Sequence, residues 1–134
     1  MIFYPNDFFK SVTEISVQNC TEFIHTETMR ERKRLLEEKS DAFIITPGGI
    51  GTFDEFFEIL TLKQLGRHNK VICIFNIDGY FDKMLEMMQV CVDKKFITDD
   101  CRKLYKVYKD MDSMLDYIEK YDPDDFDISQ VKIR

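Results

Sequence analysis

Apolar and polar residues follow one another in blocks that predict strands and helices in turn. Short apolar runs with the length and content of strands lie at residues 21–25, 41–46, 71–75 and 105–108. Segments with apolar residues at helical spacing lie at residues 52–65, 80–94 and 111–121. A further helix over residues 28–39 is predicted by Thr28-x-x-Glu31, which has the capping-box spacing that begins a helix. Strands that alternate with helices predict a parallel sheet with right-handed crossovers. The pattern therefore predicts an α/β doubly wound fold with helices on both faces of the sheet.

The length of 134 residues suits one domain. We expect a single α/β domain over residues 1–121. After the last predicted helix, the segment Asp122-Pro-Asp-Asp-Phe-Asp127 is rich in aspartate. Segments of this kind at a chain end are usually solvated, so residues 122–134 are predicted to form an acidic, mobile tail.

The charge balance is acidic and evenly spread. Residues 1–67 hold 11 acids and 8 bases, residues 68–134 hold 14 and 11, and the net charge is -6. Such a distribution gives no basic patch for nucleic acid or for an anionic membrane surface. With 44% hydrophobic residues and no apolar run long enough to span a bilayer, the chain reads as a soluble globular protein. We expect neither nucleic acid nor a membrane as partner.

The cysteines indicate the compartment. Cys20, Cys73, Cys91 and Cys101 form no C-x-x-C pair and have no histidine at metal-ligand spacing, so no metal site is predicted. The first residues contain Pro5 and Asp7 and no basic region, unlike a signal peptide. Free, mostly buried cysteines in a reducing cytoplasm are therefore expected.

A first candidate for chemistry is Met29-Arg-Glu-Arg-Lys-Arg34, where four cations crowd the first turns of a predicted helix. The helix dipole already places about half a positive charge there, which disfavours each cation by some tenths of a kcal/mol. A nearby anion would compensate. The alternative is that neighbouring glutamates neutralise the run on a solvated helix face.

A second candidate is Thr46-Pro-Gly-Gly-Ile-Gly-Thr52, between a predicted buried strand and a helix. Glycines let the backbone turn sharply and approach a ligand, and N–H groups at a helix start can hold a phosphate. The segment is neither a Walker A loop nor G-x-G-x-x-G. The alternative is an ordinary strand-to-helix turn in which Thr52-x-x-Glu55 is a capping box.

The two candidates gain weight together. Ligands of open parallel sheets collect outside the carboxyl ends of the strands, and each candidate follows such an end. If the two strands are neighbours, both helix starts open onto one crevice. Arg32 and Lys33 would then face the loop from Gly48 to Thr52, with Glu55 one turn inside. An acid beside cations and a phosphate cradle makes a plausible catalytic site.

These residues carry a family resemblance. Pro47-Gly-Gly-Ile-Gly-Thr-Phe-Asp-Glu55 resembles the PGGxGTxxE signature of the LOG family, and Met29-Arg-Glu-Arg-Lys33 resembles its upstream M-x-x-R-K motif. Further similar positions are Glu58, Thr61, 64–66, 68–70 and 76–80. The similarity extends from about Pro5 to about Tyr121. The resemblance implies a Rossmann-like fold and cytokinin riboside 5′-monophosphate phosphoribohydrolase activity, which cleaves a nucleoside 5′-monophosphate into free base and ribose 5-phosphate.

The resemblance also implies roles for individual residues. Arg32 and Glu55 would be the catalytic pair, with Lys33 beside them. The residues that would bind the substrate are Glu14, Lys33, Gly48, Gly49, Ile50, Gly51, Thr52 and Thr61. A carboxylate such as Glu55 can stabilise the oxocarbenium-like state of glycosidic cleavage or orient water, and Arg32, which stays protonated, suits positioning and electrostatic work. A homodimer and the absence of a cofactor are also implied, since nothing suggests a pyridoxal phosphate site despite the label lysine decarboxylase often given to members.

The chain departs from the family pattern at its beginning. Members usually start with two further βα units, including a glycine-rich loop, whereas the five glycines here leave no second such loop and residues 1–4 resemble only the end of the third strand. The expected fold is thus N-terminally truncated, with part of the nucleotide pocket missing and an unpaired strand edge. The family's usual histidine after Met29 is Arg30 here, which bears on contacts to the base.

Two explanations of the length and two functions stay open. The sequence is either a fragment of a longer gene or a shortened relative with altered activity. It acts either as the hydrolase or as a nucleotide- or phosphate-binding remnant without turnover.

Overall fold

The structure is a computed structural model, and it describes residues 2–5, 23–125 and 131. These residues belong to two compact units, Met1–Ser40 and Asp41–Arg134. That residues 1–121 form a single domain stays a prediction.

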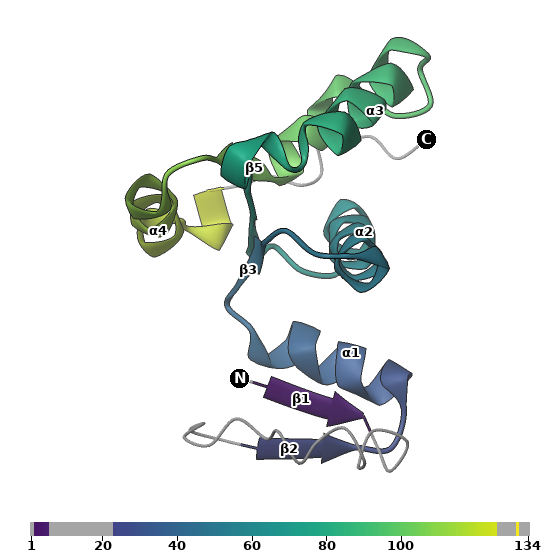
Figure 1. Cartoon of the computed structure of the whole chain (residues 1–134), viewed down its shortest axis with the longest axis vertical. Coiled ribbons are helices and arrows are strands. Elements are labelled where there is room, and N and C mark those ends of the chain that lie inside the picture. Colours follow the sequence, from purple (N-terminus) through teal and green to yellow (C-terminus); the bar gives the residue numbers. More distant parts are fainter. Residues whose placement is uncertain (1, 6–22, 126–130, 132–134) are drawn as a thin grey trace. The chain divides into compact units, whose positions relative to one another are not determined.

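The first unit contains two parallel strands and a helix (Figure 1). Strands β1 (Ile2–Pro5) and β2 (Phe23–Thr26) pair in register from Ile2 with Phe23 to Pro5 with Thr26. Helix α1 (Met29–Lys39) packs against both strands and has the predicted bounds. Its N-cap is Thr28, as the capping-box spacing predicted, because Thr28 Oγ1 accepts a hydrogen bond from Glu31 N at 3.1 Å.

The second unit is built on a three-stranded parallel sheet in the order β3-β4-β5. Its strands are β3 (Ala42–Ile45), β4 (Val71–Phe75) and β5 (Lys106–Tyr108). Its α-helices are α2 (Ile50–Gln64), α3 (Asp82–Asp93) and α4 (Met111–Lys120). Short 3-10 helices are η2 (Ile77–Gly79), η3 (Asp99–Leu104) and η4 (Pro123–Asp125). The predicted alternation and the parallel sheet are confirmed.

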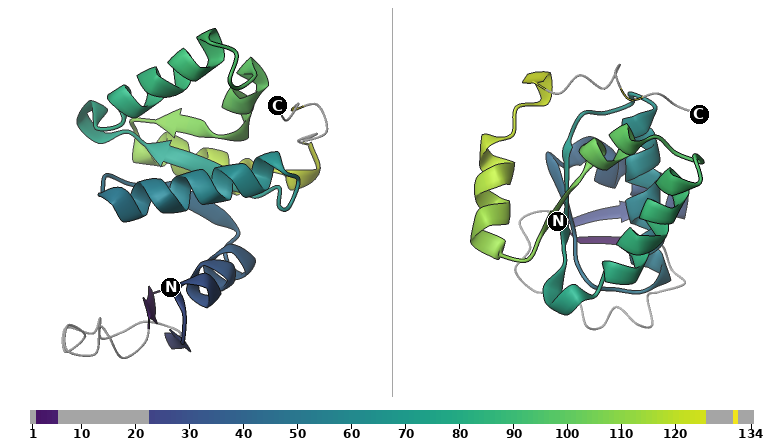
Figure 2. Two further views of the ribbon diagram at one scale, coloured as in Figure 1. Left: turned by 90° about the vertical axis from the view of Figure 1, so that its right-hand side faces the viewer. Right: turned by 90° about the horizontal axis from the view of Figure 1, so that it is seen from above.

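Strand β4 divides the second unit into two cores. Its side chains alternate between the faces of the sheet, as those of any strand do. Ile72 and Ile74 belong to the core that contains residues of α2 and α3, whereas Val71 and Cys73 pack with Met114 of α4. Figure 2 shows α2 and α3 on one side of the sheet and α4 on the other. Helices therefore cover both faces, and the α/β Rossmann-like fold class is confirmed.

Two described residues of the segment after α4, Pro123 and Val131, contact the rest of the second unit. Asn69 Nδ2 donates a hydrogen bond to the carbonyl of Pro123. The side chain of Val131 is only 6% exposed and belongs to the core between the sheet and the helices α2 and α3. That residues 122–134 form an acidic tail stays a prediction.

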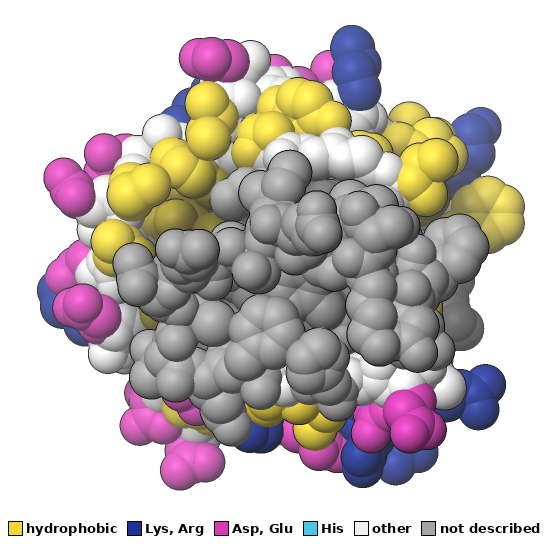
Figure 3. All heavy atoms as spheres, turned by 60° about the horizontal axis from the view of Figure 1, so that its bottom comes forward, with side chains coloured by type: hydrophobic (Ala, Val, Ile, Leu, Met, Phe, Trp, Pro, Cys, Tyr) yellow, Lys and Arg dark blue, Asp and Glu magenta, His cyan; other side chains and the backbone are white. Residues whose placement is uncertain are grey.

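The surface of the described residues has mixed character, and the cysteines differ in burial. On the face shown in Figure 3, acidic and basic side chains are intermixed around the rim, and hydrophobic side chains gather mostly in the upper part of the view. Within the described ranges, no helix combines the length and apolar character that crossing a membrane requires. The free cysteines Cys73 and Cys101 are buried, as predicted, and Cys91 is half-buried. Cys20 lies outside the described residues.

Lys63 is a charged residue in the interior that the hydrophobic pattern did not predict. Its side chain is 2% exposed, and Nζ donates to the Lys70 carbonyl at 2.8 Å and to Tyr121 Oη at 3.1 Å. Nζ also lies 5.2 Å from the centre of the Tyr121 ring. Burial lowers the pKa of this ammonium from 10.5 to about 8, although Cys73 acts in the opposite direction. Lys63 therefore joins α2 to the start of β4 and the end of α4 at an electrostatic cost.

We predict that Lys63→Met stabilises the fold more at neutral than at alkaline pH. The folded state disfavours the protonated amine. The contribution of Lys63 to the free energy of unfolding is therefore largest above pH 10.5 and is lost as the pH falls through about 8. The difference in the free energy of unfolding between Lys63→Met and wild type should be about 2 kcal/mol more favourable to the variant at about pH 7 than at about pH 9.5. Denaturant unfolding at both pH values measures the difference.

Lys83→Met is the matched control, because the Lys83 side chain is 88% exposed. It should show no such pH-dependent gain. A Lys63→Met gain that is equal at both pH values would contradict the assignment of the cost to the buried charge.

Candidate functional site

The glycine-rich loop lies between β3 and α2, and α2 begins at Ile50, two residues earlier than predicted. Gly49 is the N-cap in an extended conformation, and no side chain caps the helix. The N–H groups of Thr52 and Phe53 donate to the Gly49 carbonyl. Thr52 is thus the third residue inside the helix, and the alternative of a Thr52-x-x-Glu55 capping box is wrong. Glycine serves as N-cap because the backbone carbonyl alone accepts the first helical bonds.

The start of α2 is suited to an anion. The helix has 15 residues, its first turn contains no acid, and it has no side-chain cap. Its N–H groups and the positive end of its dipole therefore point toward the loop without a side-chain oxygen of their own at the cap. A phosphate is the ligand that such a terminus favours, and Gly49, Ile50, Gly51 and Thr52 are the residues placed there.

Gly48 is required by packing. A Cβ built on Gly48 would meet Thr52 Oγ1 at 2.1 Å and Thr52 Cβ at 3.1 Å. A Cβ built on Gly49 would meet nothing within 4 Å. The Thr52 side chain thus lies directly against the Gly48 backbone, which fixes the loop to the first turn of α2.

Glu55 and Thr61 lie at different depths along α2. Glu55 is half-buried and follows Gly51 by four residues, which places both on one face one turn apart. Thr61 follows Thr52 by nine residues, roughly 13 Å further along the axis. Thr61 Oγ1 donates to the Phe57 carbonyl at 2.7 Å. The structure therefore brings Glu55, but not Thr61, to the loop, and a Thr61 contact with the nucleotide stays a prediction.

Arg32 and Lys33 lie in the first unit, on the first turns of α1. Both side chains are half-buried, and Arg32 NH1 lies 3.9 Å from Met29 Sδ. Arg34 pairs with Glu38 at 3.5 Å on an exposed face, so the alternative of local neutralisation holds for Arg34. Because α1 and α2 belong to separate units, the meeting of Arg32 with Glu55 stays a prediction. Glu14 lies outside the described residues.

The loop after β4 supplies contacts to the glycine-rich loop that the sequence did not predict. Tyr80 Oη donates a hydrogen bond to the Gly48 carbonyl. Asn76 is 2% exposed, and its side chain bonds to Phe81 N at 2.8 Å and Asp82 Oδ1 at 2.7 Å. The sequence offered two signals: Asp78-Gly79, typical of a tight turn, directly before Tyr80, and the similarity of residues 76–80 to the LOG family.

His68 has a structural role. Nδ1 accepts from Lys70 N at 3.2 Å, so Nε2 carries the proton and donates to the Ile59 carbonyl at 2.9 Å. The ring also lies 5.7 Å from that of Phe43. Within the described residues, no group of three or more His, Cys, Asp or Glu side chains could hold a metal ion.

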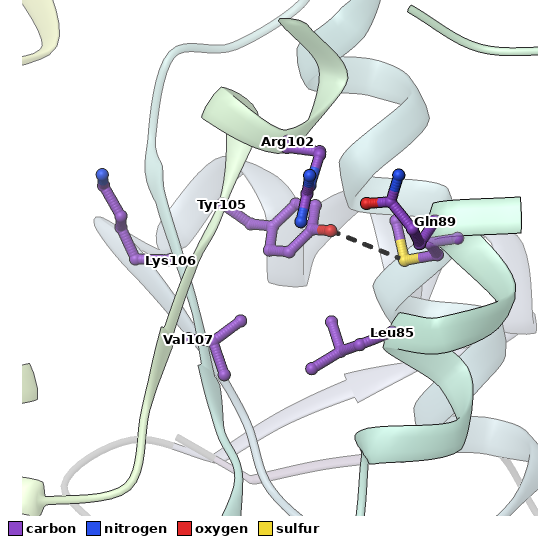
Figure 4. Close-up of a pocket in the computed structure, with 7 residues that line it drawn as sticks. Leu85, Gln89, Arg102, Tyr105, Lys106 and Val107 are labelled. Atoms are coloured by element: carbon purple, nitrogen blue, oxygen red, sulfur yellow. Dashed lines mark hydrogen bonds between the residues drawn. The ribbon is translucent and has the colours of Figure 1, made fainter. Parts of the chain in front are cut away.

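A pocket of about 260 Å³ lies elsewhere in the second unit, beside the start of β5 (Figure 4). Its walls come from α3, η3 and β5, and Tyr105 Oη lies 3.8 Å from Met88 Sδ within it. The residues that line it are Leu85, Met88, Gln89, Arg102, Tyr105, Lys106 and Val107. Since this is the amino end of β5 and the glycine-rich loop follows the carboxyl end of β3, the pocket is separate from the candidate site.

The chain matches a known protein family over most of its length. The model of the family described as "Possible lysine decarboxylase" matches residues 3–118. A cytokinin riboside 5′-monophosphate phosphoribohydrolase of Arabidopsis thaliana is 36% identical over 115 residues, which are 84% of this chain and 54% of the relative. A phosphoribohydrolase of the same name from Rhodococcoides fascians is 36% identical over 107 residues, 80% of this chain and 54% of the relative.

A third relative is a probable cytokinin riboside 5′-monophosphate phosphoribohydrolase of Oryza sativa subsp. japonica. It is 38% identical over 109 residues, 81% of this chain and 49% of the relative. The chain thus spans about half the length of the curated relatives it matches.

We predict that Gly48→Ala destabilises the second unit, because the new methyl group overlaps Thr52. The free energy of unfolding should fall by about 1–3 kcal/mol, as in other overpacked sites. Gly49→Ala is the matched control and should change it by less than about 0.5 kcal/mol. Denaturant unfolding measures both.

A double-mutant cycle identifies the clashing partner. Thr52→Ala removes Oγ1, so Gly48→Ala should be less damaging in that background than in wild type. A loss for Gly48→Ala that is the same in both backgrounds would contradict the overlap with Thr52.

Proposed function

Because the chain belongs to the LOG family, we propose that it hydrolyses the N-glycosidic bond of a nucleoside 5′-monophosphate, AMP or a cytokinin riboside monophosphate. The observation that carries the proposal is the start of α2, a helix without a side-chain cap behind a glycine-rich loop, with Glu55 one turn inside. The relatives named as phosphoribohydrolases support the reaction class.

In the proposed reaction, the bond between ribose C1′ and the base nitrogen breaks and water supplies the new hydroxyl on C1′. The base leaves with a proton, and ribose 5-phosphate is the second product. The departing base leaves positive charge on the sugar, and the Glu55 carboxylate stabilises that charge or orients the attacking water. The reaction as proposed uses no cofactor.

The remaining residues bind and orient the substrate in this proposal. The loop from Gly48 to Thr52 receives the 5′-phosphate at the helix start. Arg32, with Lys33 beside it, works as a permanent positive charge that positions the nucleotide, because a guanidinium is a poor proton donor. Glu14 and Thr61 are proposed as further contacts to the nucleotide. A homodimer and a cytoplasmic location complete the proposal and rest on the family resemblance and the composition.

A second candidate function is nucleotide or phosphate binding without turnover. It is favoured by one observation, the division of the nominated residues between two units. The second unit contains the phosphate-binding loop and Glu55, whereas Arg32 and Lys33 belong to the first. Binding could thus persist where catalysis does not.

We predict that the chain releases adenine from AMP and that Glu55→Gln abolishes most of this activity. Loss of the carboxylate removes the electrostatic stabilisation of the sugar cation, so kcat should fall about a hundredfold or more. Chromatographic detection of the free base measures turnover, and calorimetry measures AMP binding in parallel.

Asp54→Asn is the matched control, since it neutralises an exposed carboxylate on the neighbouring position of α2. It should keep near wild-type turnover. AMP binding without base release by the wild-type chain supports the second function, and equal turnover by Glu55→Gln and wild type would remove Glu55 from the mechanism.

A further inference from the structure

The loop between β4 and α3 donates a hydrogen bond to the glycine-rich loop. Tyr80 Oη donates its hydrogen bond to the carbonyl of Gly48, 32 residues earlier in the chain. Both residues belong to the second unit, and they follow the carboxyl ends of two paired strands. This contact joins the two loops by a single side-chain hydroxyl.

The bonded carbonyl controls the N–H of the next residue. Gly48 C=O and Gly49 N–H belong to one planar trans peptide unit, in which the two groups point in opposite directions. A hydrogen bond that holds the carbonyl toward Tyr80 therefore holds the Gly49 N–H away from it. Neither flanking residue has a Cβ, so this peptide can rotate more readily than others in the chain. A hydrogen bond from outside the loop, such as that of Tyr80, therefore favours one orientation.

The position of Tyr80 is itself set by a buried anchor. The Asn76 side chain, 2% exposed, accepts from Phe81 N and donates to Asp82 Oδ1. Between these ends, Asp78 and Gly79 have φ values of 50° and 70°, in the left-handed region. For a non-glycine residue this conformation costs about 1 kcal/mol and persists only where its surroundings impose it. The surroundings thus hold the turn in a strained conformation, and this conformation places Tyr80 beside the glycine-rich loop.

The Tyr80 ring is also oriented by packing. It meets the ring of Phe81 edge to face, with centroids 5.0 Å apart and planes at 87°. Phe81 is 1% exposed and belongs to the core. Tyr80 is nonetheless 50% exposed, so its hydroxyl is placed at the surface beside the loop and its ring contributes little to the core.

We propose that Tyr80 is a positioning residue that orients the Gly48–Gly49 peptide so that the Gly49 N–H serves the phosphate of the substrate. The inference rests on the proposed function and deepens it. Its consequence is selectivity: Tyr80 favours nucleoside 5′-monophosphates over nucleosides, because only the former carry the phosphate that the oriented N–H receives.

The test compares AMP with adenosine as substrates of the full-length chain. Tyr80→Phe removes only the hydroxyl, and kcat/KM for AMP should fall about five- to tenfold, mostly through KM, as expected for one hydrogen bond. The value for adenosine should not change. Tyr117→Phe, the same chemical change on α4, should alter neither. An equal fall for both substrates, as a merely structural role would give, or no fall for AMP, overturns the inference.

Calorimetry with ribose 5-phosphate separates this inference from the proposed function. If the wild-type chain releases no base, the hydrolase proposal fails, but wild type should still bind ribose 5-phosphate about five- to tenfold more tightly than Tyr80→Phe. Equal affinities, or no binding by wild type, overturn the inference as well. In Tyr80→Phe, the NMR amide resonance of Gly49 should shift, whereas the unfolding midpoint should match that of Tyr117→Phe. An unshifted Gly49 resonance would contradict a changed orientation of the Gly48–Gly49 peptide.

Discussion

The parallel pairing of β3 with β4 is the constraint on which the site of the second unit depends. The register runs from Ala42 with Val71 to Ile45 with Ile74, so both strands end at nearly the same level. Parallel strands bring the loops at their carboxyl ends to one edge of the sheet. The glycine-rich loop and the loop that contains Tyr80 are therefore adjacent although 32 residues separate their contact points.

Helices α1 and α2 differ in how the N–H groups at their N-termini are satisfied. Helix α1 is capped by the Thr28 hydroxyl and has Glu31 in its first turn, so its own residues satisfy the terminus. Helix α2 begins at a glycine and has neither a side-chain cap nor an acid in its first turn. The N–H groups at the start of α2 are therefore more open to an anion than those at the capped start of α1.

The sequence was sufficient for elements with a strong local signal and insufficient for contacts between distant segments. The apolar run of β4 and the bounds of α1 could be predicted because strand content and a capping residue are local features. The start of α2 was misplaced because glycine can cap a helix through its carbonyl alone. The start of α3 at Asp82 instead of Tyr80 follows from the left-handed turn at Asp78, which a buried Asn76 imposes.

Long-range contacts explain the remaining gaps. Lys63 is charged, yet it lies three residues after Leu60 on the buried face of α2, and its partners come from the start of β4 and the end of α4. No periodicity identifies such partners. The approach of Arg32 to Glu55 depends in the same way on two segments far apart in the chain. Residue types and motif spacing could nominate this pair, but its meeting stays a prediction, because the two residues belong to separate units.

The nominated site residues are divided between the two units, and the division separates phosphate binding from turnover in the proposed function. The groups that suit a phosphate, the loop from Gly48 to Thr52 with Tyr80 behind it, belong to the second unit, which has two cores of its own. The proposed cation Arg32 belongs to the first. In the proposed function, phosphate binding uses residues of the second unit alone, whereas turnover also uses Arg32 of the first unit. On this proposal, a change confined to the first unit should reduce turnover before it reduces affinity for the phosphate, because only turnover uses a residue from each unit.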